Sequence, residues 1–334
     1  MSTSHQETVS LKSPLAATVF YLINILLFPL TLIGYVLHIG YLFLGRQPGV
    51  STTAQGPLSA RWTQHHLGVR EDEAASRLMV SLLGFFPLGW YLMAGPMLLA
   101  HRLTGYVPKA FRYPYEGEVA VQHQASARQT FFDAVIKQYL ANITQLVILG
   151  AGFDTRAYRL PNDAQIQVFE VDGPKTQAVK RQLLEKTGLN ASRVTFVSAD
   201  FEKEDWFSRL VQAGFDPRKP ALFLWEGVVH YLDREAVEST LHKIASIAKG
   251  SVVAFDYFTT EPLVSRGLYW RFGRAATKAA GEPLKFGIDS TPPSRERLAE
   301  LLRSCGLRLV EQRTLGDETG GKRAWGGFAI AIVN

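Results

Sequence analysis

The chain has 334 residues, which is more than one average domain, so we expect one large core with an added N-terminal region. Its 36 basic and 30 acidic residues give a formal net charge of +6 and are spread along the chain, without the Lys/Arg runs of nucleic-acid-binding proteins. We therefore predict no nucleic-acid partner. The single cysteine, Cys305, excludes an internal disulfide and lies in a helical pattern typical of a core residue.

The first long apolar stretch runs over residues 13–45 and contains no Asp, Glu, Lys or Arg. About 20 apolar helical residues cross the hydrocarbon core of a bilayer. The stretch therefore predicts one tilted or overlong transmembrane helix and is too short for two full spans. Its expected interfacial anchors are Lys12, Tyr21, Tyr35, Tyr41 and Arg46.

A second uncharged stretch covers residues 78–100 and is interrupted by two prolines and three glycines. This pattern leaves a second span, a broken helix, a re-entrant hairpin and a buried lid open. We predict an N-terminal membrane region over 1–110 and a catalytic domain over 111–334. The loop between the two stretches carries both positive and negative charges, so the orientation of the chain in the membrane is poorly determined. A soluble cosubstrate would place the catalytic domain on the cytosolic side.

After about Gly117, short apolar runs alternate with amphipathic helical stretches, which predicts an α/β fold with a mostly parallel sheet. Helices are expected over 126–140 and 175–187. A terminal hairpin over 307–311 and 325–333 would supply an antiparallel C-terminal strand. The other predicted strands cover 145–149, 166–171, 194–197, 221–225 and 251–255.

Carboxylates follow four of these predicted strands, at Asp172, Asp200, Glu226 and Asp256. In an open parallel sheet, ligands bind outside the carboxyl ends of the strands, so these side chains are expected to line one crevice. Each one alone has a structural alternative, because an Asp after a strand is often only the N-cap of the next helix.

A glycine turn, Gly150-Ala151-Gly152, directly follows the strand over 145–149. With Asp172 about twenty residues further on, it satisfies part of the dinucleotide-binding fingerprint. The third glycine is replaced by Thr155, and Asp154 would repel a pyrophosphate at this turn. The residues therefore favour a cofactor without phosphate over a dinucleotide.

S-adenosylmethionine meets this requirement, because it carries an ammonium and a sulfonium and has no phosphate. Asp154 near the turn would attract the two cations, and Asp172 would accept hydrogen bonds from the ribose diol. The cofactor's own carboxylate requires a cation, and Arg128 on the preceding helix is suited to a bidentate pair. The alternative for Arg128 is an ordinary exposed helix arginine.

Six blocks of the sequence resemble the leucine carboxyl methyltransferase family and occur in family order over roughly residues 125–334. They are Arg128–Asp133, Val147–Leu160, Phe169–Asp172, Gly214–Pro217, Glu226–Leu232 and Gly281–Asp289. The resemblance implies a Rossmann-like class I methyltransferase fold. It also implies cofactor contacts at Arg128, Gly150, Asp172, Asp200 with Phe201, and Glu226. The apolar N-terminal third has no counterpart in the soluble members.

These observations predict methyl transfer from S-adenosylmethionine to a carboxylate or hydroxyl oxygen, with no metal site. The acceptor-side candidates are Arg156 to orient a carboxylate, and His230 or Tyr231 to assist deprotonation of a hydroxyl. The aromatic segment over 259–288 is interpreted as a lid, with core packing as the alternative. We expect a small-molecule or lipid-like acceptor. The rival readings are a nicotinamide-dependent oxidoreductase and a membrane-tethered, non-catalytic scaffold, and the oligomeric state stays open.

Overall fold

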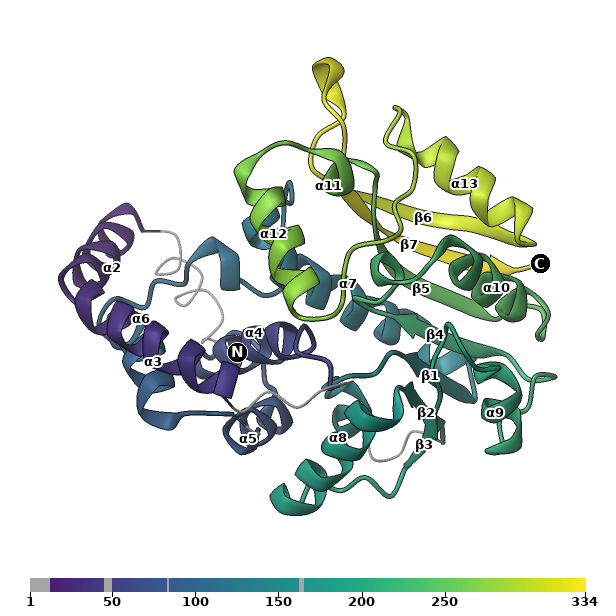
Figure 1. Ribbon diagram of the computed structural model, residues 1–334, viewed down its shortest axis with the longest axis horizontal. Helices are drawn as coiled ribbons and strands as arrows, with labels where there is room; N and C mark the ends of the chain where they lie inside the picture. Colours follow the sequence, from purple (N-terminus) through teal and green to yellow (C-terminus); the bar gives the residue numbers. More distant parts are fainter. Residues whose placement is uncertain (1–12, 45–49, 83, 162–164) are drawn as a thin grey trace, which may run out of the picture.

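The computed structural model describes residues 13–44, 50–82, 84–161 and 165–334. Its centre is a seven-stranded sheet in the order β3-β2-β1-β4-β5-β7-β6, and a group of helices from the N-terminal third lies to one side of it (Figure 1). The strands are β1 (Gln145–Leu149), β2 (Gln167–Asp172), β3 (Val194–Ser198), β4 (Ala221–Trp225), β5 (Val252–Phe258), β6 (Leu307–Leu315) and β7 (Gly326–Val333).

The first five strands are parallel, and β7 runs antiparallel to both β5 and β6. This arrangement confirms the mostly parallel sheet with an antiparallel C-terminal strand that was predicted for a class I methyltransferase fold. The strand order reverses between β1 and β4, which are neighbours in the sheet. In open α/β sheets, ligands bind at such a switch point.

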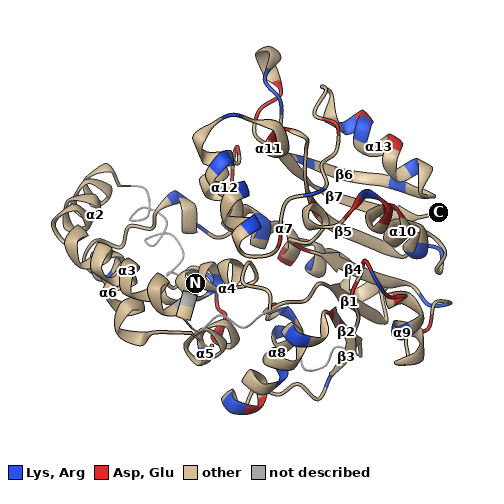
Figure 2. Ribbon diagram, viewed as in Figure 1, with Lys and Arg blue, Asp and Glu red and all other residues tan. Residues whose placement is uncertain are grey.

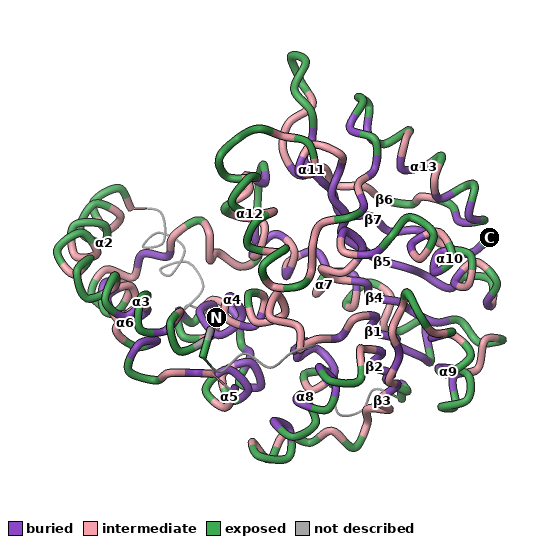
Figure 3. The backbone as a smooth tube through the Cα atoms, in the orientation of Figure 1, coloured by how far each residue is buried: buried purple, intermediate pink, exposed green. Residues whose placement is uncertain are grey.

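Alternate residues of each central strand pack on opposite faces of the sheet. In β1, Val147 and Leu149 belong to one hydrophobic core, whereas Leu146 and Ile148 belong to the other. The first core is covered by α9 (Trp206–Gln212), α10 (Arg234–Ala245) and α13 (Ser294–Ser304), and the second by α7 (Gln124–Tyr139). The buried centre of the molecule therefore follows the sheet (Figure 3).

The apolar stretch over 13–45 forms two helices, α2 (Pro14–Leu26) and α3 (Phe28–Leu44), that are bent by 61°. Pro29 accounts for the break, because it has no N–H and its ring clashes with the carbonyl of Ile25. The prediction of one overlong helix is therefore wrong. Among the described residues, no single helix is long and apolar enough to cross a membrane, although this bent pair together meets that criterion. The proposed anchors Lys12 and Arg46 lie outside the described residues.

The second uncharged stretch is divided between α5 (Glu73–Ser81) and α6 (Pro87–Thr104), so the broken-helix alternative applies. Helix α6 packs along α3, and the closest approach is at two glycines. A Cβ on Gly34 would lie 2.4 Å from the backbone nitrogen of Met93, and one on Gly89 would lie 2.9 Å from the nitrogen of His38. Small residues thus allow the two backbones to touch.

Two further N-terminal helices pack on the sheet region instead. Leu58 and Trp62 of α4 (Gln55–His66) and Leu78 of α5 share a core with Val179 and Leu183 of α8 (Pro174–Thr187). The predicted boundary near residue 110 therefore does not separate two packing units. Helices α2 and α3 form the outlying group, and α6 joins it to the body of the molecule, because Trp90 and Ala94 of α6 belong to the core shared by α4, α5 and α8.

The segment over 259–288, which was predicted as a lid, leaves the sheet after β5 and returns beside the end of that strand. Thr259, after β5, forms a parallel bridge with Ile288, so the ends of the excursion meet. Between them lie α11 (Glu261–Val264) and α12 (Leu268–Ala279). Phe286 is buried in the core, while Tyr269 and Phe272 are exposed, so only part of the aromatic content packs inward.

Candidate active site

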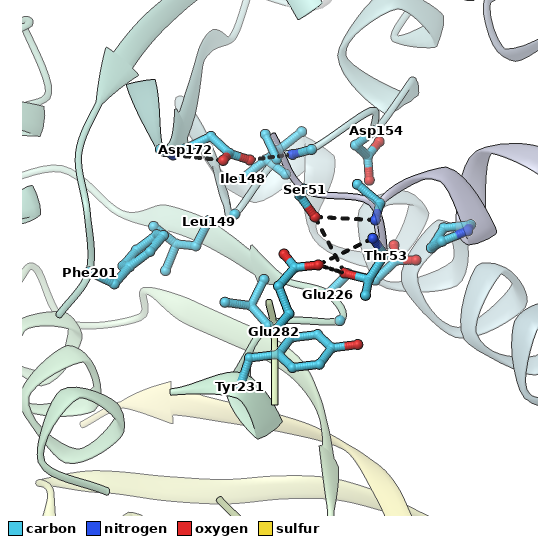
Figure 4. Close-up of a pocket in the computed structure, with 18 of the residues that line it drawn as sticks. Ser51, Thr53, Ile148, Leu149, Asp154, Asp172, Phe201, Glu226, Tyr231 and Glu282 are labelled. Carbon is cyan, nitrogen blue, oxygen red and sulfur yellow. Dashed lines mark hydrogen bonds between the residues drawn. The ribbon is translucent and has the colours of Figure 1, made fainter. Parts of the chain in front are cut away.

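A cavity of about 400 Å³ lies at the carboxyl edge of the sheet, where β1, β2 and β4 end (Figure 4). Its volume is within the range of small-molecule sites. Its walls include the predicted residues Arg128, Gly150, Gly152, Asp154, Asp172, Asp200, Phe201, Glu226, His230 and Tyr231. The structure therefore brings these predicted residues to one cavity, and their part in binding a ligand stays a prediction.

The glycine turn after β1 requires its glycines. Gly150 and Gly152 have φ values of +63° and +42°, and a Cβ on Gly150 would lie 2.3 Å from Cγ2 of Val228. The Asp172 carboxylate accepts hydrogen bonds from the backbone nitrogens of Gly152 (2.5 Å) and Gly173 (2.6 Å). Burial raises the pKa of Asp172, and these two hydrogen bonds oppose that rise. Asp172 thus fixes the turn while it faces the cavity.

Beyond β3, Asp200 and Phe201 form another part of the wall. Asp200 pairs with Lys203 at 2.9 Å, and Phe201 packs against the core beside Trp206. Both positions were implied by the family resemblance, and the structure brings them to the same cavity as Asp172. Their part in binding a cofactor stays a prediction.

A buried ion cluster lies beside the turn. Arg156 contacts Asp133 (2.7 Å), Asp154 (2.5 Å) and Glu226, and Arg61 of α4 contacts both Asp154 and Glu226 at 3.1 Å. Burial alone would raise the pKa of Asp154, but the two arginines hold it well below its usual value. The cluster joins α4 to the ends of β1 and β4.

This cluster corrects two predictions. Arg156 is buried among carboxylates, and it is not one of the described residues that line the cavity. It is therefore not placed to orient an acceptor. Asp154 does line the cavity, but its charge is already balanced by two guanidinium groups, so it is not the free carboxylate that would attract a cationic cofactor. Both predictions failed because these charges pair with residues that are far away in the sequence. Local motifs do not reveal such pairs.

A third correction concerns Asp256. Its carboxylate accepts hydrogen bonds from the backbone nitrogen of Gly227 (2.5 Å) and pairs with Arg128 at 2.7 Å. It is 1 % exposed and lies beneath the cavity wall, so three of the four strand-end carboxylates, not all four, line the crevice. Asp256 acts on the site through Arg128, which it holds against Gly227.

His230 and Tyr231 follow β4 in a short turn at the side of the cavity (Figure 4 labels Tyr231). The His230 ring stacks on Phe258 at 4.3 Å, and burial, with a smaller contribution from Arg128, lowers the pKa of His230 to about 3. Burial raises the pKa of Tyr231. Both side chains are therefore neutral near pH 7.

Several polar atoms in this wall are buried and lack a hydrogen-bond partner within the described part of the chain. They are Nε2 of Gln124, Nε of Arg128, Oε1 of Glu226 and Nδ1 of His230. Buried polar groups are normally satisfied, and leaving one unpaired costs about 1–3 kcal/mol. Four such atoms around one cavity indicate that it is built to receive a polar ligand.

Sequence reasoning missed the residues that close the cavity from above. Before α4, the backbone nitrogen and Oγ1 of Thr53 donate hydrogen bonds to Oε2 of Glu282 at 3.2 and 2.7 Å (Figure 4). Ser51 and Arg61 also line the cavity. Glu282 lies in a block that carried the family resemblance, which was a usable signal. Thr53 and Arg61 lie in a segment assigned to the membrane region, and no local pattern connected them to the site.

Part of the chain is similar to proteins named as methyltransferases. A family model described as leucine carboxyl methyltransferase matches residues 102–245. A protein of Mycobacteroides abscessus named a putative S-adenosyl-L-methionine-dependent methyltransferase is 34% identical over 212 residues, which cover 63% of this chain and 64% of that protein. One from Mycolicibacterium smegmatis with the same name is 36% identical over 175 residues, covering 52% and 53%. The chain thus spans about half to two thirds of these curated relatives.

Solved structures are less similar in sequence. A DUF574 family protein from Streptomyces avermitilis superposes with a TM-score of 0.47 at 18% identity, over 83% of this chain and 97% of that one. The sequence relatives and the family model therefore carry the comparison, and the family model, over residues 102–245, covers the glycine turn, Asp172, Asp200 and the β4 turn.

Proposed function

We propose that this protein is an S-adenosylmethionine-dependent methyltransferase of the leucine carboxyl methyltransferase family that acts on an oxygen atom. The main support is the cavity at the switch point of the sheet, where the Gly150 turn and Asp172 meet four unsatisfied polar atoms. The family match over residues 102–245 covers these positions and supports the same assignment.

The charges around the cavity suit this cofactor better than a phosphate-bearing one. Asp172 and Glu282 line the cavity without a salt bridge to any described residue, whereas Glu226, like Asp154, is paired with Arg61 and Arg156. The carboxylates of Asp172 and Glu282 would repel a pyrophosphate, whereas they would attract a sulfonium and an ammonium. Oε1 of Glu226 and the carboxylate of Asp172 would accept hydrogen bonds from the ammonium and the ribose.

The cofactor supplies an activated methyl group, whose bond to sulfur breaks as the new bond to the acceptor oxygen forms. The protein's part is to position the two reactants and to exclude water. Asp172 and Phe201 would hold the nucleoside end, and Arg128, kept in place by Asp256, would face the cofactor carboxylate. Thr53 and Glu282 would close the cavity above it.

A carboxylate acceptor is supported over a hydroxyl by the state of the side chains at the β4 turn. His230 has a pKa of about 3 and is a weak base, and Tyr231 is neutral. A carboxylate needs no base, whereas a hydroxyl must release its proton. We expect the rate to be nearly independent of pH above the acceptor's own pKa. A rate that rises steadily toward pH 9 would indicate a hydroxyl acceptor instead.

We also propose that α2 and α3 associate with a membrane as a bent pair, with the catalytic region on the cytosolic side where the cosubstrate is supplied. Fifteen large apolar side chains would otherwise face water, including Leu15, Ile25, Leu26 and Leu44 at 70% exposure or more, and Figure 2 shows no charged residue on either helix. A lipophilic acceptor that partitions into the bilayer would suit this placement.

Calorimetric titration of S-adenosylmethionine into the detergent-solubilised protein tests the cofactor. Phe201→Ala should weaken binding about tenfold or more, because it removes an aromatic wall of the cavity. Phe207→Ala is a matched control, since Phe207 is partly buried against the same core but does not line the cavity. Absence of binding in the folded protein, or equal loss in both variants, would refute the assignment.

Binding and catalysis need separate tests, because a scaffold that lost activity would still bind the cofactor. Incubation with S-adenosylmethionine carrying a labelled methyl group and a panel of lipophilic carboxylic acids should give labelled esters, which base hydrolyses. Label that resists base would support hydroxyl ethers. Binding without transfer to any oxygen acceptor would favour the scaffold.

A further inference from the structure

Helix α12 has an amphipathic pattern whose apolar side faces outward. Leu268, Tyr269 and Phe272 are 67%, 60% and 71% exposed, and Ala275 and Ala276 are exposed on the same side. At 100° per residue these five positions fall within one arc of about 120°. In a water-soluble protein the apolar face of a surface helix normally packs inward. The outward side of α12 therefore lacks its expected cover.

The inner side of α12 is held firmly, so this orientation is set by packing. Trp270 contacts the rings of Phe258 (5.8 Å) and Trp325 (5.8 Å). Arg274 donates hydrogen bonds to the carbonyls of Pro262 (2.7 Å) and Ser265 (2.9 Å). Turning the apolar residues inward would break these contacts.

Basic residues accompany the exposed apolar face. Residues 262–281 contain Arg266, Arg271, Arg274 and Lys278 and no Asp or Glu, and the cations of α12 appear as blue bands in Figure 2. Within the described ranges, no carboxylate lies within salt-bridge distance of Arg266, Arg271 or Lys278, and all three are exposed. An apolar helix face bordered by unpaired cations is typical of helices that lie in the interface of an anionic membrane.

We propose that α12 is an interfacial helix that docks on an anionic lipid surface, with Leu268 and Phe272 in the acyl boundary and Arg271 and Lys278 at the headgroups. This contact is separate from the bent pair α2–α3 and does not depend on methyl transfer. A second copy of this chain fits less well, because a two-fold contact through α12 would bring like charges together.

Helix α12 packs against a residue that lines the cavity. Trp270 packs on Phe258, which lines the cavity and stacks on His230. Two residues after α12 ends, Gly281 leads to Glu282, which closes the cavity with Thr53. A lipid surface at α12 would therefore lie next to the cavity wall that contains Phe258 and Glu282, so that a lipophilic acceptor in that surface would be close to the site.

A single environment-sensitive fluorophore tests this contact separately from α2–α3. Cys305 is the one cysteine and is buried, so Phe272→Cys places a label selectively on α12. Ala213→Cys, exposed after α9, is the labelled control. On mixing full-length protein with phosphatidylcholine vesicles containing phosphatidylglycerol, we expect a blue shift at position 272 and none at 213. Pure phosphatidylcholine should give a weaker response.

Removal of positive charges from α12 provides a second test of the proposal. In the Phe272→Cys background, Arg271→Gln with Lys278→Gln should weaken the response to anionic vesicles about 30-fold, from about 1 kcal/mol per cation. Arg295→Gln with Arg303→Gln on α13 is the matched control. The proposal is overturned if position 272 does not respond while the protein floats with vesicles. It is also overturned if charge removal has no effect, or if the shift depends on protein concentration without vesicles, which would indicate a second copy.

Discussion

The N-terminal third contains two groups of helices that are neighbours in sequence but differ in what they bury. Helices α4 and α5 and the loop between them carry buried charged residues: Arg61 of α4 is 2% exposed, and Arg70 of the loop is 3% exposed. Helices α2 and α3 carry no charge, yet most of their large apolar side chains are exposed. Hydrophobicity therefore does not identify which group belongs to the core. Ion pairing at the edge of the sheet does identify the group that belongs to the core. A charged side chain stays buried only where oppositely charged side chains lie beside it.

The largest expected effect tests the buried group. Arg61→Met removes the guanidinium that contacts both Asp154 and Glu226 and leaves an uncompensated charge beside Arg156. We expect a loss of about 3–5 kcal/mol in the free energy of unfolding, measured by urea titration in detergent. Arg77→Met is the control, because its pair with Glu73 is exposed and should contribute no more than about 1 kcal/mol. Equal effects would show that the cluster does not anchor α4.

The next prediction tests how the outlying group holds together. Gly34→Leu should force α3 away from α6, because a Cβ there would lie 2.4–2.7 Å from backbone atoms of residues 89–93. We expect a loss of about 1–3 kcal/mol, seen as a lower unfolding midpoint. Gly40→Leu on the same helix meets no atom within 4 Å and should be neutral or slightly stabilising. Tolerance of Gly34→Leu would mean that the two helices are not in fixed contact.

The sheet was predictable to within a few residues because its signals are local. The predicted apolar runs of four to six residues ended at or shortly before Gly, Asp or Glu, and the strands over 145–149 and 221–225 occur where they were expected. The glycine turn and Asp172 were found for the same reason. Arg61 and Thr53 were missed because their partners lie 93 to 229 residues away. The bend at Leu27 had a local signal in Pro29, which apolar length alone obscured.

A smaller effect is expected where the two regions meet above the cavity. Thr53→Val removes one hydroxyl that donates to Glu282 at 2.7 Å. We expect cofactor binding to weaken about fivefold, since one such hydrogen bond contributes about 1 kcal/mol. Thr52→Val is an adjacent control, because the Thr52 hydroxyl is buried without a partner in the described structure. If both variants bind alike, the Thr53–Glu282 contact does not close the site.

The smallest expected effect on stability tests the exposed group. Ile25 on α2 is 70% exposed, so Ile25→Ser should change the free energy of unfolding in detergent by no more than about 0.5 kcal/mol. Phe20→Ser on the same helix is the contrast, because Phe20 is 2% exposed and packs against Ala100 and Tyr106, so its replacement should destabilise clearly. Vesicle flotation then separates folding from membrane binding: Ile25→Ser should lower partitioning several-fold, because one apolar side chain no longer enters the lipid. Unchanged flotation would contradict the proposal that the exposed apolar surface of α2 binds a membrane. A large loss of stability would show that Ile25 packs on protein.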